Sequence, residues 1–303
     1  MDILTNKVEI TVGIISPGDM GHVVSRVLID HGLRVVSCLA ERSQRTRRLA
    51  AKAGVTDLPS YADLVEQADL ILSILVPAQA VKAAQKVAGA ISSVEATTQA
   101  DVLYVDCNAV APRTAKQIDR IIKNVGGNFL DASIIGPPPR SDGSTRFYAS
   151  GPNVGQLNIL NQYGLEIRPL GQEIGQASAI KMCYAALTKG LTALCAELLI
   201  AAEALGVSAD LAEEFELSQT ALYQRMQKGL PSLPSKSRRW IGEMEEIAVT
   251  FADVGLTPNI LTGAAGIFRF ISQTELADLS PEQPDAFPNM EEMITQLARD
   301  LQS

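Results

Sequence analysis

The chain has 303 residues, of which 47% are hydrophobic, 20% are charged and 5% are aromatic. Its formal net charge of −8 argues against a nucleic-acid-binding protein, because a surface that follows phosphates needs a clustered excess of lysine and arginine. The chain is also long enough for two domains, since a single hydrophobic core rarely grows beyond about 250–300 residues.

The first part of the chain alternates short β-branched runs with helical patterns. Strands are predicted at residues 9–15, 34–39, 70–75, 102–105, 128–130, 145–149 and 166–169, and the first helices at 19–31 and 44–53. Strands that alternate with helices are joined by right-handed crossovers, so the pattern predicts an α/β domain with a doubly wound parallel sheet.

After Gly175 the pattern becomes helical. Residues 177–205 are almost continuous helix formers and are apolar on most sides, which is typical of a helix buried between other elements. A later helix, which Ser235 or Ser237 can cap, and a final amphipathic helix after the linker 281–284 complete the pattern. These helices predict an all-helical second domain.

Several absences narrow the function. Glu197 and Glu203 interrupt the longest apolar helix, so we expect it not to span a bilayer, and with no targeting segment visible a cytoplasmic location is expected. The two histidines, His22 and His31, both fall in the first helix, so neither a metal site nor a Ser-His-Asp triad is expected. Four cysteines without C-x-x-C spacing are expected to be reduced, buried thiols: Cys38, Cys107, Cys183 and Cys195.

A glycine turn follows the first strand and leads into the first helix. The pattern reads Ser16-x-Gly18-x-x-Gly21, so serine stands where the dinucleotide-binding pattern has its first glycine. Bare backbone in such a turn can approach a pyrophosphate, and the helix that follows directs its N-terminal amides at the negative charge. We predict a Rossmann-type cofactor site here, and an ordinary strand-turn-helix is the alternative. The residues predicted to contact the cofactor are Ser16, Pro17, Gly18, Asp19 and Met20.

Polar residues follow the second strand. Glu41 lies near the position of an acid that binds the ribose 2′-hydroxyl of NAD. Arg42 and Ser43, with Arg45 nearby, instead suit the 2′-phosphate of NADP, because the guanidinium group forms paired hydrogen bonds with phosphate. The prediction is therefore NADP, with NAD possible, and a helix start with solvated charges is the alternative.

Asn108 and Arg239 are candidate ligand-binding residues. Asn108 comes just after a predicted strand, at the edge where such sheets bind ligands, and its amide could contact the nicotinamide or a substrate oxygen; a turn-forming role is the alternative. Arg238 and Arg239 fall in the predicted first turn of a helix, where the helix dipole disfavours cations. Their anionic partner is either a substrate carboxylate on Arg239 or Glu243 four residues later.

Lys181 is the candidate catalytic residue. It lies among apolar residues at the start of the long helix, and a desolvated lysine can serve as a general acid or base. The alternative is a lysine that extends from a buried helix to the surface.

Four motifs in order resemble the β-hydroxyacid dehydrogenase and 6-phosphogluconate dehydrogenase superfamily. They are Gly13–Gly21 for its G-x-I-G-x-G-x-M-G, Val105–Pro112 for V-D-x-S-T-x-x-P, Phe129–Gly136 for F-L-D-A-P-V-S-G, and Gly175–Lys181 for G-x-x-x-x-x-K. Segments 238–247 and 255–258 also resemble a little-characterised subgroup with its own helical C-terminal domain. The resemblance covers the entire chain.

The resemblance implies a nicotinamide cofactor, a catalytic role for Lys181, and a homodimer. It also implies that Arg42 and Ser43 match the family's NADP motif and that Val76 and Pro77 form a loop against the cofactor. Two positions differ from the family: its substrate-binding serine falls on Ile135, and its asparagine after the lysine falls on Tyr184. Tyr184 lies one helical turn from Lys181, so its hydroxyl could transfer a proton or hold substrate; a half-buried structural tyrosine is the alternative.

Together these observations predict a Rossmann domain at residues 1–173 and a helical domain for substrate binding and dimerisation at 174–303. The expected activity is an NAD(P)-dependent dehydrogenase or reductase acting on a small hydroxy or keto compound, with Lys181 and Tyr184 as catalytic residues. Nucleic acid and membrane are not expected partners. An imine reductase and a non-catalytic NADPH-binding sensor are the two alternatives; the replaced family serine and asparagine motivate the sensor.

Overall fold

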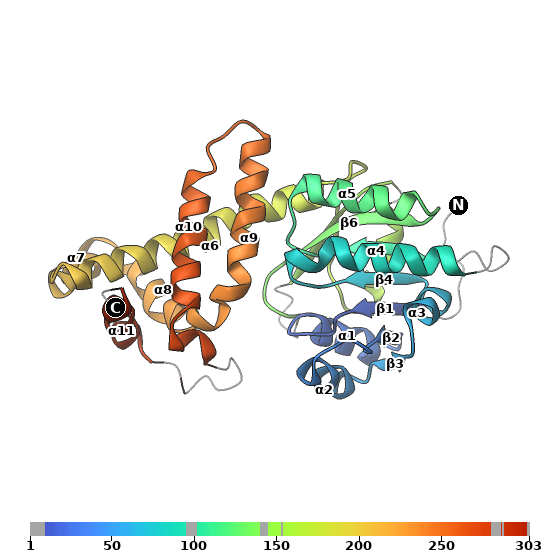
Figure 1. Ribbon diagram of the computed structural model, residues 1–303, viewed down its shortest axis with the longest axis horizontal. Coiled ribbons are helices and arrows are strands. Elements are labelled where there is room, and N and C mark those ends of the chain that lie inside the picture. The colour runs from blue at the N-terminus through green and yellow to red at the C-terminus, as the bar shows by residue number, and fades with distance from the viewer. Residues whose placement is uncertain are drawn as a thin grey trace. The chain divides into compact units, whose positions relative to one another are not determined.

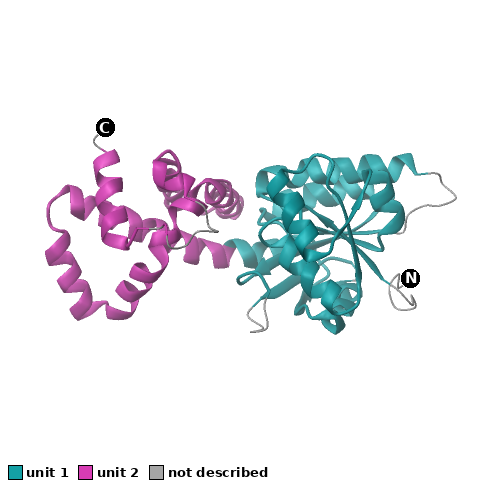
Figure 2. Ribbon diagram, turned by 90° about the horizontal axis from the view of Figure 1, so that it is seen from below, with its two compact units in different colours: residues 1–182 teal, residues 183–303 magenta. Residues whose placement is uncertain are grey.

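The computed structural model describes residues 10–94, 102–139, 145–152, 154–279, 286 and 288–301. The chain forms two compact units, residues 1–182 and 183–303 (Figure 2). The division lies inside a long helix, α6 (Gln176–Ala204), and therefore later than the predicted boundary at residue 174. The predicted linker at 281–284 lies outside the described residues.

The N-terminal unit contains one eight-stranded sheet in the order β3-β2-β1-β4-β5-β6-β7-β8. Its first six positions follow the strand order of dinucleotide-binding folds. The elements in chain order are β1 (Thr11–Ile15), α1 (Gly21–Asp30), β2 (Arg34–Cys38), α2 (Gln44–Ala53), β3 (Thr56–Leu58), α3 (Tyr61–Gln67), β4 (Leu70–Ser73), α4 (Pro77–Ser93), β5 (Leu103–Asp106), α5 (Pro112–Lys123), β6 (Asn128–Ile135), β7 (Arg146–Ser150), the 3-10 helix η2 (Val154–Tyr163) and β8 (Ile167–Gly171).

The sheet is mostly parallel, as predicted, with one reversal at its far edge. Strands β1 to β6 are parallel, β7 pairs antiparallel with β6, and β8 runs parallel to β7. Helix α1 and η2 cover one face through a core that includes Val24, Leu28 and Leu160. Helices α3, α4 and α5 cover the other face, around Leu64, Val87 and Ile118 (Figure 1). The carboxyl ends of β1 and β4 lie side by side, so the loops after them share one edge.

The second unit is helical, as predicted. It contains most of α6 together with α7 (Ser208–Ser218), α8 (Thr220–Gly229), η3 (Leu230–Ser232), α9 (Pro234–Asp253), α10 (Asn259–Ser272), η4 (Glu275–Asp278) and α11 (Met290–Asp300). Helices α9 and α10 pack along each other (Figure 1). Their seam includes Met244, Ile247 and Phe268, all buried.

Three details differ from the sequence predictions. Helix α9 begins at Pro234 without a side-chain cap, so the predicted serine caps are wrong, because Ser237 donates to the carbonyl of Pro234 from inside the helix. Arg239 consequently lies beyond the first turn, where the dipole acts weakly on it. Cys183 is exposed, whereas the other three cysteines are buried as expected.

Within the described ranges, α6 is the one helix that is long and apolar enough to cross a membrane by length and composition. This is weak grounds for a membrane span, because core helices of soluble proteins meet the same criteria.

Candidate functional site

The loop after β1 places Ser16 in a left-handed backbone conformation, with φ of 65°. The amide of Gly18 donates to the carbonyl oxygen of Ser16 at 2.7 Å, which closes a tight turn. Left-handed backbone favours glycine, because a Cβ crowds the following carbonyl oxygen. The serine therefore adopts the geometry of the pattern's first glycine at some cost in strain.

Gly18 and Gly21 have different physical roles in this loop. A Cβ on Gly21 would lie 2.6 Å from the carbonyl oxygen of Ser16, so only glycine allows α1 to pack this closely against the turn. A Cβ on Gly18 would have no protein atom nearer than 4.0 Å. The bare backbone of Gly18 thus faces open space, which fits the close approach of a cofactor pyrophosphate.

The first turn of α1 is suited to an anion. It carries no acidic residue, and Met20 at the N-cap position makes no side-chain hydrogen bond to the helix amides. These amides and the helix dipole favour a phosphate group. Asp19, also predicted to hold the cofactor, is exposed and forms an ion pair with Arg45 at 2.6 Å, while Pro17 is buried in the turn.

A small cavity of about 150 Å³ lies beyond the end of β2. Glu41 and Arg42 line it together with Lys82 and Lys86 of α4. The hydrogen bond and charge of Lys86 lower the pKa of Glu41, so this exposed carboxylate is already paired with a cation. Arg42 donates to the hydroxyl of Tyr61 at 3.1 Å. The cavity therefore has three cations for one carboxylate.

Other predicted residues support this edge of the sheet. Ser43 caps α2 by accepting from the amide of Thr46 at 3.2 Å, so its hydroxyl has a structural use. Val76 is 42% exposed and precedes Pro77, the first residue of α4. An exposed apolar residue at the loop after β4 is consistent with the predicted contact to a cofactor.

Asn108 is buried, and its amide joins two strand ends. Its side-chain oxygen accepts from the amide of Leu75, and its side-chain nitrogen donates to Ser73 Oγ at 3.0 Å and to Asp106 Oδ1 at 2.5 Å. Both amide hydrogens are therefore used within the protein. These bonds favour a positioning role for Asn108 over direct contact with a nicotinamide or a substrate.

Asp106 and Asp131, which lie opposite each other on β5 and β6, are buried carboxyl groups that the sequence prediction assigned no role. Burial raises the pKa of Asp106 to about 7, with a further contribution from the charge of Asp131. Its Oδ2 has no hydrogen-bond partner among the described residues. A charged residue within or at the end of an otherwise apolar strand is the sequence signal that could have singled out both residues.

Asp131 anchors the start of α6. Its carboxylate accepts from the amides of Gly175 at 2.9 Å and Ser178 at 3.0 Å, and from Ser178 Oγ at 2.6 Å and Ser150 Oγ at 3.1 Å. Burial raises the pKa of Asp131, and these donors act in the opposite direction. The first turn of α6 is thereby fixed to β6 of the sheet.

This anchoring positions Lys181. The side chain is half-buried, and its Nζ donates to the carbonyl oxygen of Ile134 at 2.6 Å, near the carboxyl end of β6. Ile135, at the place of the family serine, is buried and offers no polar group. Tyr184 follows on α6 with 47% of its surface exposed.

Arg239 contacts a carboxylate of its own helix. Its Nε lies 3.6 Å from Glu243 Oε1, and Arg238 pairs with Asp278 at 2.6 Å. The structure thus has the ion pair that was the alternative to a substrate contact for Arg239. No cluster of three or more histidine, cysteine, aspartate or glutamate side chains able to hold a metal occurs among the described residues.

Two family descriptions match separate parts of the chain. The NAD binding domain of 6-phosphogluconate dehydrogenase matches residues 11–154, which contain β1 to β7. A domain of unknown function, DUF1932, matches residues 202–271 in the helical unit.

Two relatives are uncharacterised proteins. A 28.5 kDa protein of Methanothermus fervidus is 28% identical over 263 residues, which are 86% of this chain and 99% of that protein. The oxidoreductase slr0229 of Synechocystis is 26% identical over 198 residues, which are 64% of this chain and 67% of that protein.

Two solved structures are similar over most of the chain. The conserved protein MTH1747, described as structurally similar to 3-hydroxyacid dehydrogenases, is 30% identical with a TM-score of 0.63 and covers 89% of this chain and 100% of its own. The Mycobacterium tuberculosis 3-hydroxyisobutyrate dehydrogenase with L-serine has a TM-score of 0.67 and 19% identity, covering 98% and 100%. At 19% identity the likeness shows the fold alone.

Proposed function

The chain belongs to the 6-phosphogluconate dehydrogenase NAD-binding superfamily, with a C-terminal DUF1932 domain, and on this premise we propose a specific reaction for it. As a member it is an NAD(P)-binding oxidoreductase. The proposed reaction is hydride transfer between the nicotinamide cofactor and a small hydroxy or keto substrate, with a hydroxy acid as the first candidate. A bound cofactor would supply or accept the hydride, and Lys181 acts as the general acid or base.

The observation that carries this proposal is the placement of Lys181. Its amine is held at the carbonyl of Ile134 by a helix whose start is fixed through Asp131. A half-buried amine at the carboxyl side of the sheet can give a proton to a substrate carbonyl oxygen or remove one from a hydroxyl group. Tyr184 is proposed as a second polar group for the substrate, because its side chain is exposed on the same helix.

The turn Ser16–Met20 is proposed to hold the pyrophosphate, and the cavity after β2 the adenosine ribose. We propose NADP as the preferred cofactor. Lys86 already neutralises Glu41, and Arg42 and Lys82 remain on the same cavity for a 2′-phosphate. In a fluorescence titration of the purified protein, NADPH is expected to bind more tightly than NADH.

The function is tested by replacing Lys181. We expect Lys181→Met to lower kcat by about 10²–10⁴-fold on the best substrate in a panel of hydroxy acids, aldehydes, ketones and imines, because the proton-transfer group is lost. Binding of NADPH should be unchanged. Lys123→Met is the matched control, because Lys123 is exposed on α5 and pairs with Asp119 of its own helix.

Other results of the same experiment would favour one of the two alternative functions or exclude the role of Lys181. Turnover of imines alone would favour an imine reductase, and NADPH binding without turnover of any class would favour the sensor. Full activity of Lys181→Met would remove the proposed role of this lysine.

We further propose a homodimer and a cytoplasmic location. An apolar groove of about 440 Å³ runs between α6 and α10, with Leu194 and Ile260 strongly exposed beside the small residues Gly190 and Gly263. In a two-fold contact, the large side chains of one copy could pack against the small residues of the same face on a second copy. The four free cysteines support a reducing compartment.

A further inference from the structure

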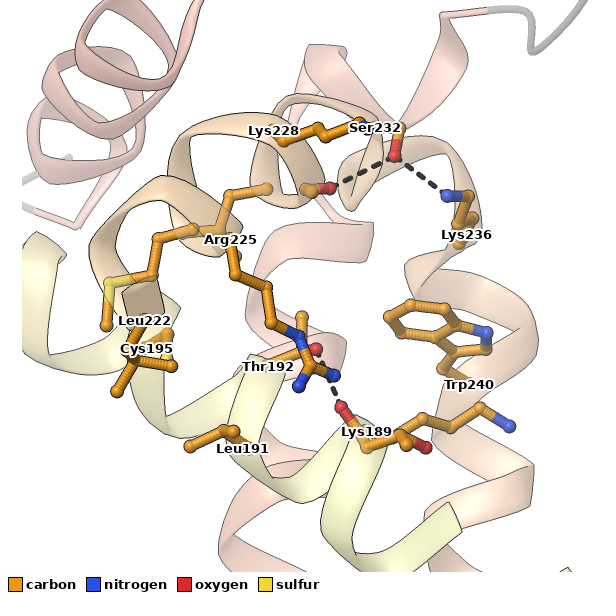
Figure 3. Close-up of a pocket in the computed structure, with 14 residues that line it drawn as sticks. Lys189, Leu191, Thr192, Cys195, Leu222, Arg225, Lys228, Ser232, Lys236 and Trp240 are labelled. Atoms are coloured by element: carbon orange, nitrogen blue, oxygen red, sulfur yellow. Dashed lines mark hydrogen bonds between the residues drawn. The ribbon is translucent and has the colours of Figure 1, made fainter. Parts of the chain in front are cut away.

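The helical unit contains a cavity of about 450 Å³ that the oxidoreductase reaction does not use. It lies among α6, α8, η3 and α9, and none of its lining residues belongs to the sheet. Its charged lining residues are all cations: Lys189, Arg225, Lys228 and Lys236. Figure 3 shows Arg225 extending into the space between Thr192 and Trp240, and Lys236 pointing toward Ser232.

One of these cations is already neutralised. Lys189 forms a close ion pair with Glu243, which also accepts the weaker contact from Arg239. Burial lowers the pKa of Lys189, and the carboxylate opposes this effect. Glu243 is thus shared by two cations and is not a free partner for the remaining ones.

The other three cations have no carboxylate partner within the described part of the chain. Lys236 donates to Ser232 Oγ at 2.7 Å, and its pKa is lowered by burial and by the charge of Arg239. Arg225 and Lys228 take part in no ion pair among the described residues, and Arg225 is close enough to oppose the raised pKa of Cys195. Arg225 and Lys228 are exposed and Lys236 is half-buried. Three like charges that face one cavity repel one another, and a bound anion would offset this repulsion.

The uncharged walls restrict the kind of anion. The centroid of the Trp240 ring lies 5.7 Å from Lys189 Nζ and 5.9 Å from Lys236 Nζ, and its π face attracts these ammonium groups. Leu191, Leu222 and Leu230 add apolar surface. Arg225 offers a planar pair of donors suited to an oxyanion. The cavity therefore combines oxyanion donors with room for a short carbon skeleton.

We propose that this cavity is a separate binding site for a small organic oxyanion with two or more negative charges, such as a phosphate monoester or a dicarboxylate. Arg225, Lys228 and Lys236 contact its charged groups, and Trp240 with the leucines contacts the carbon skeleton. The site stands independently of the reaction proposed for Lys181.

The fluorescence of Trp240 provides a direct test, because the chain contains a single tryptophan. The whole protein is titrated with inorganic phosphate, glycerol phosphate and succinate at constant ionic strength, with chloride as the monovalent reference. We expect a saturable change with the multivalent anions, weakened by added salt, and tighter binding of glycerol phosphate or succinate than of inorganic phosphate. The tighter of these two organic anions identifies the preferred class of charged group.

Matched arginine variants locate the site. Arg225→Gln should weaken binding by about tenfold or more, because it removes a charge-assisted pair of hydrogen bonds. Arg238→Gln is the control, because Arg238 lies on the same helix as Trp240 but is exposed and paired with Asp278. Lys181→Met should leave anion binding unchanged, which separates this site from the proposed catalytic one.

A second measurement is needed in case anion binding leaves the fluorescence of Trp240 unchanged. Binding should also raise the melting temperature of the wild-type protein and of Arg238→Gln but not that of Arg225→Gln. The proposal is overturned by a response that follows ionic strength alone, by equal binding in the two arginine variants, or by neither fluorescence nor thermal response to any multivalent anion.

Discussion

Ser16 illustrates how far single residues could be interpreted from the sequence. The pattern Ser16-x-Gly18-x-x-Gly21 predicted a cofactor loop between a strand and a helix, and the structure has the strand, turn and helix in the predicted order. The φ of 65° could not be inferred, because serine at this position normally signals an ordinary turn. Asn108 was predicted to contact the nicotinamide or a substrate from its place after a strand, but its bonds to Leu75 and Asp106 depend on two neighbouring strands and could not be predicted locally.

The strain at Ser16 leads to a prediction. Ser16→Gly should raise the free energy of unfolding by about 0.5–1 kcal/mol, because relief of the left-handed penalty exceeds the added entropy of glycine in the unfolded chain. Urea denaturation measures the effect. Ser16→Ala is the control, since it removes the hydroxyl group and keeps the Cβ. Equal stability of the glycine and alanine variants would show that the backbone conformation carries no penalty.

At the level of elements, most strands, their mainly parallel direction and the first helices were predictable, but the reversal at β7 was not. The seven predicted strands match observed ones, but β3 has only three residues and was missed. The antiparallel direction of β7 depends on its pairing with β6, which no local pattern records. The start of α9 was placed too late, because Pro234 begins the helix without a capping side chain.

The paired strands β5 and β6 give a prediction about pH. Burial raises the pKa of Asp106 to about 7 in the folded protein, whereas in the unfolded chain the carboxyl group has its ordinary pKa of 3.8. Raising the pH from 4 to 7 therefore removes stability, by up to about 4 kcal/mol, and the loss persists above pH 7. The wild-type protein should be less stable in urea at pH 8 than at pH 5.

Asp106→Asn should strongly reduce the difference in stability between pH 5 and pH 8. The asparagine side chain has no proton to lose, and its oxygen still accepts a hydrogen bond from Asn108. Part of the pH dependence of the free energy of unfolding should remain, because burial also raises the pKa of Asp131. Asp210→Asn, at an exposed position on α7, should keep the wild-type slope. A wild-type protein whose stability does not fall between pH 5 and pH 8 would contradict the prediction.

At the level of the whole molecule, an α/β domain followed by a helical domain was predictable, because the sequence pattern becomes helical after Gly175. The position of the division was not, because it depends on the hydrogen bonds that join the first turn of α6 to Asp131. The cationic cavity was also missed, since Lys189, Arg225 and Lys236 come from three helices and form no motif in the sequence.

The proposed homodimer can be tested through the groove between α6 and α10. Leu194→Glu should convert the dimer into a monomer in size-exclusion chromatography with light scattering, because a buried carboxylate at the centre of an apolar contact is costly. Leu217→Glu is the control, since Leu217 is also an exposed leucine but lies on α7 outside the groove. A monomeric wild-type protein, or a dimer that survives Leu194→Glu, would rule out this interface.

The uneven burial of the thiols has a practical consequence. A maleimide dye applied to the native protein should attach at Cys183 and spare the three cysteines that are buried. Because Cys183 lies two residues after Lys181, the label would report on the surroundings of the proposed catalytic amine without any engineered mutation. A dye on Cys183 could thus be used to follow ligand binding and turnover in the wild-type protein.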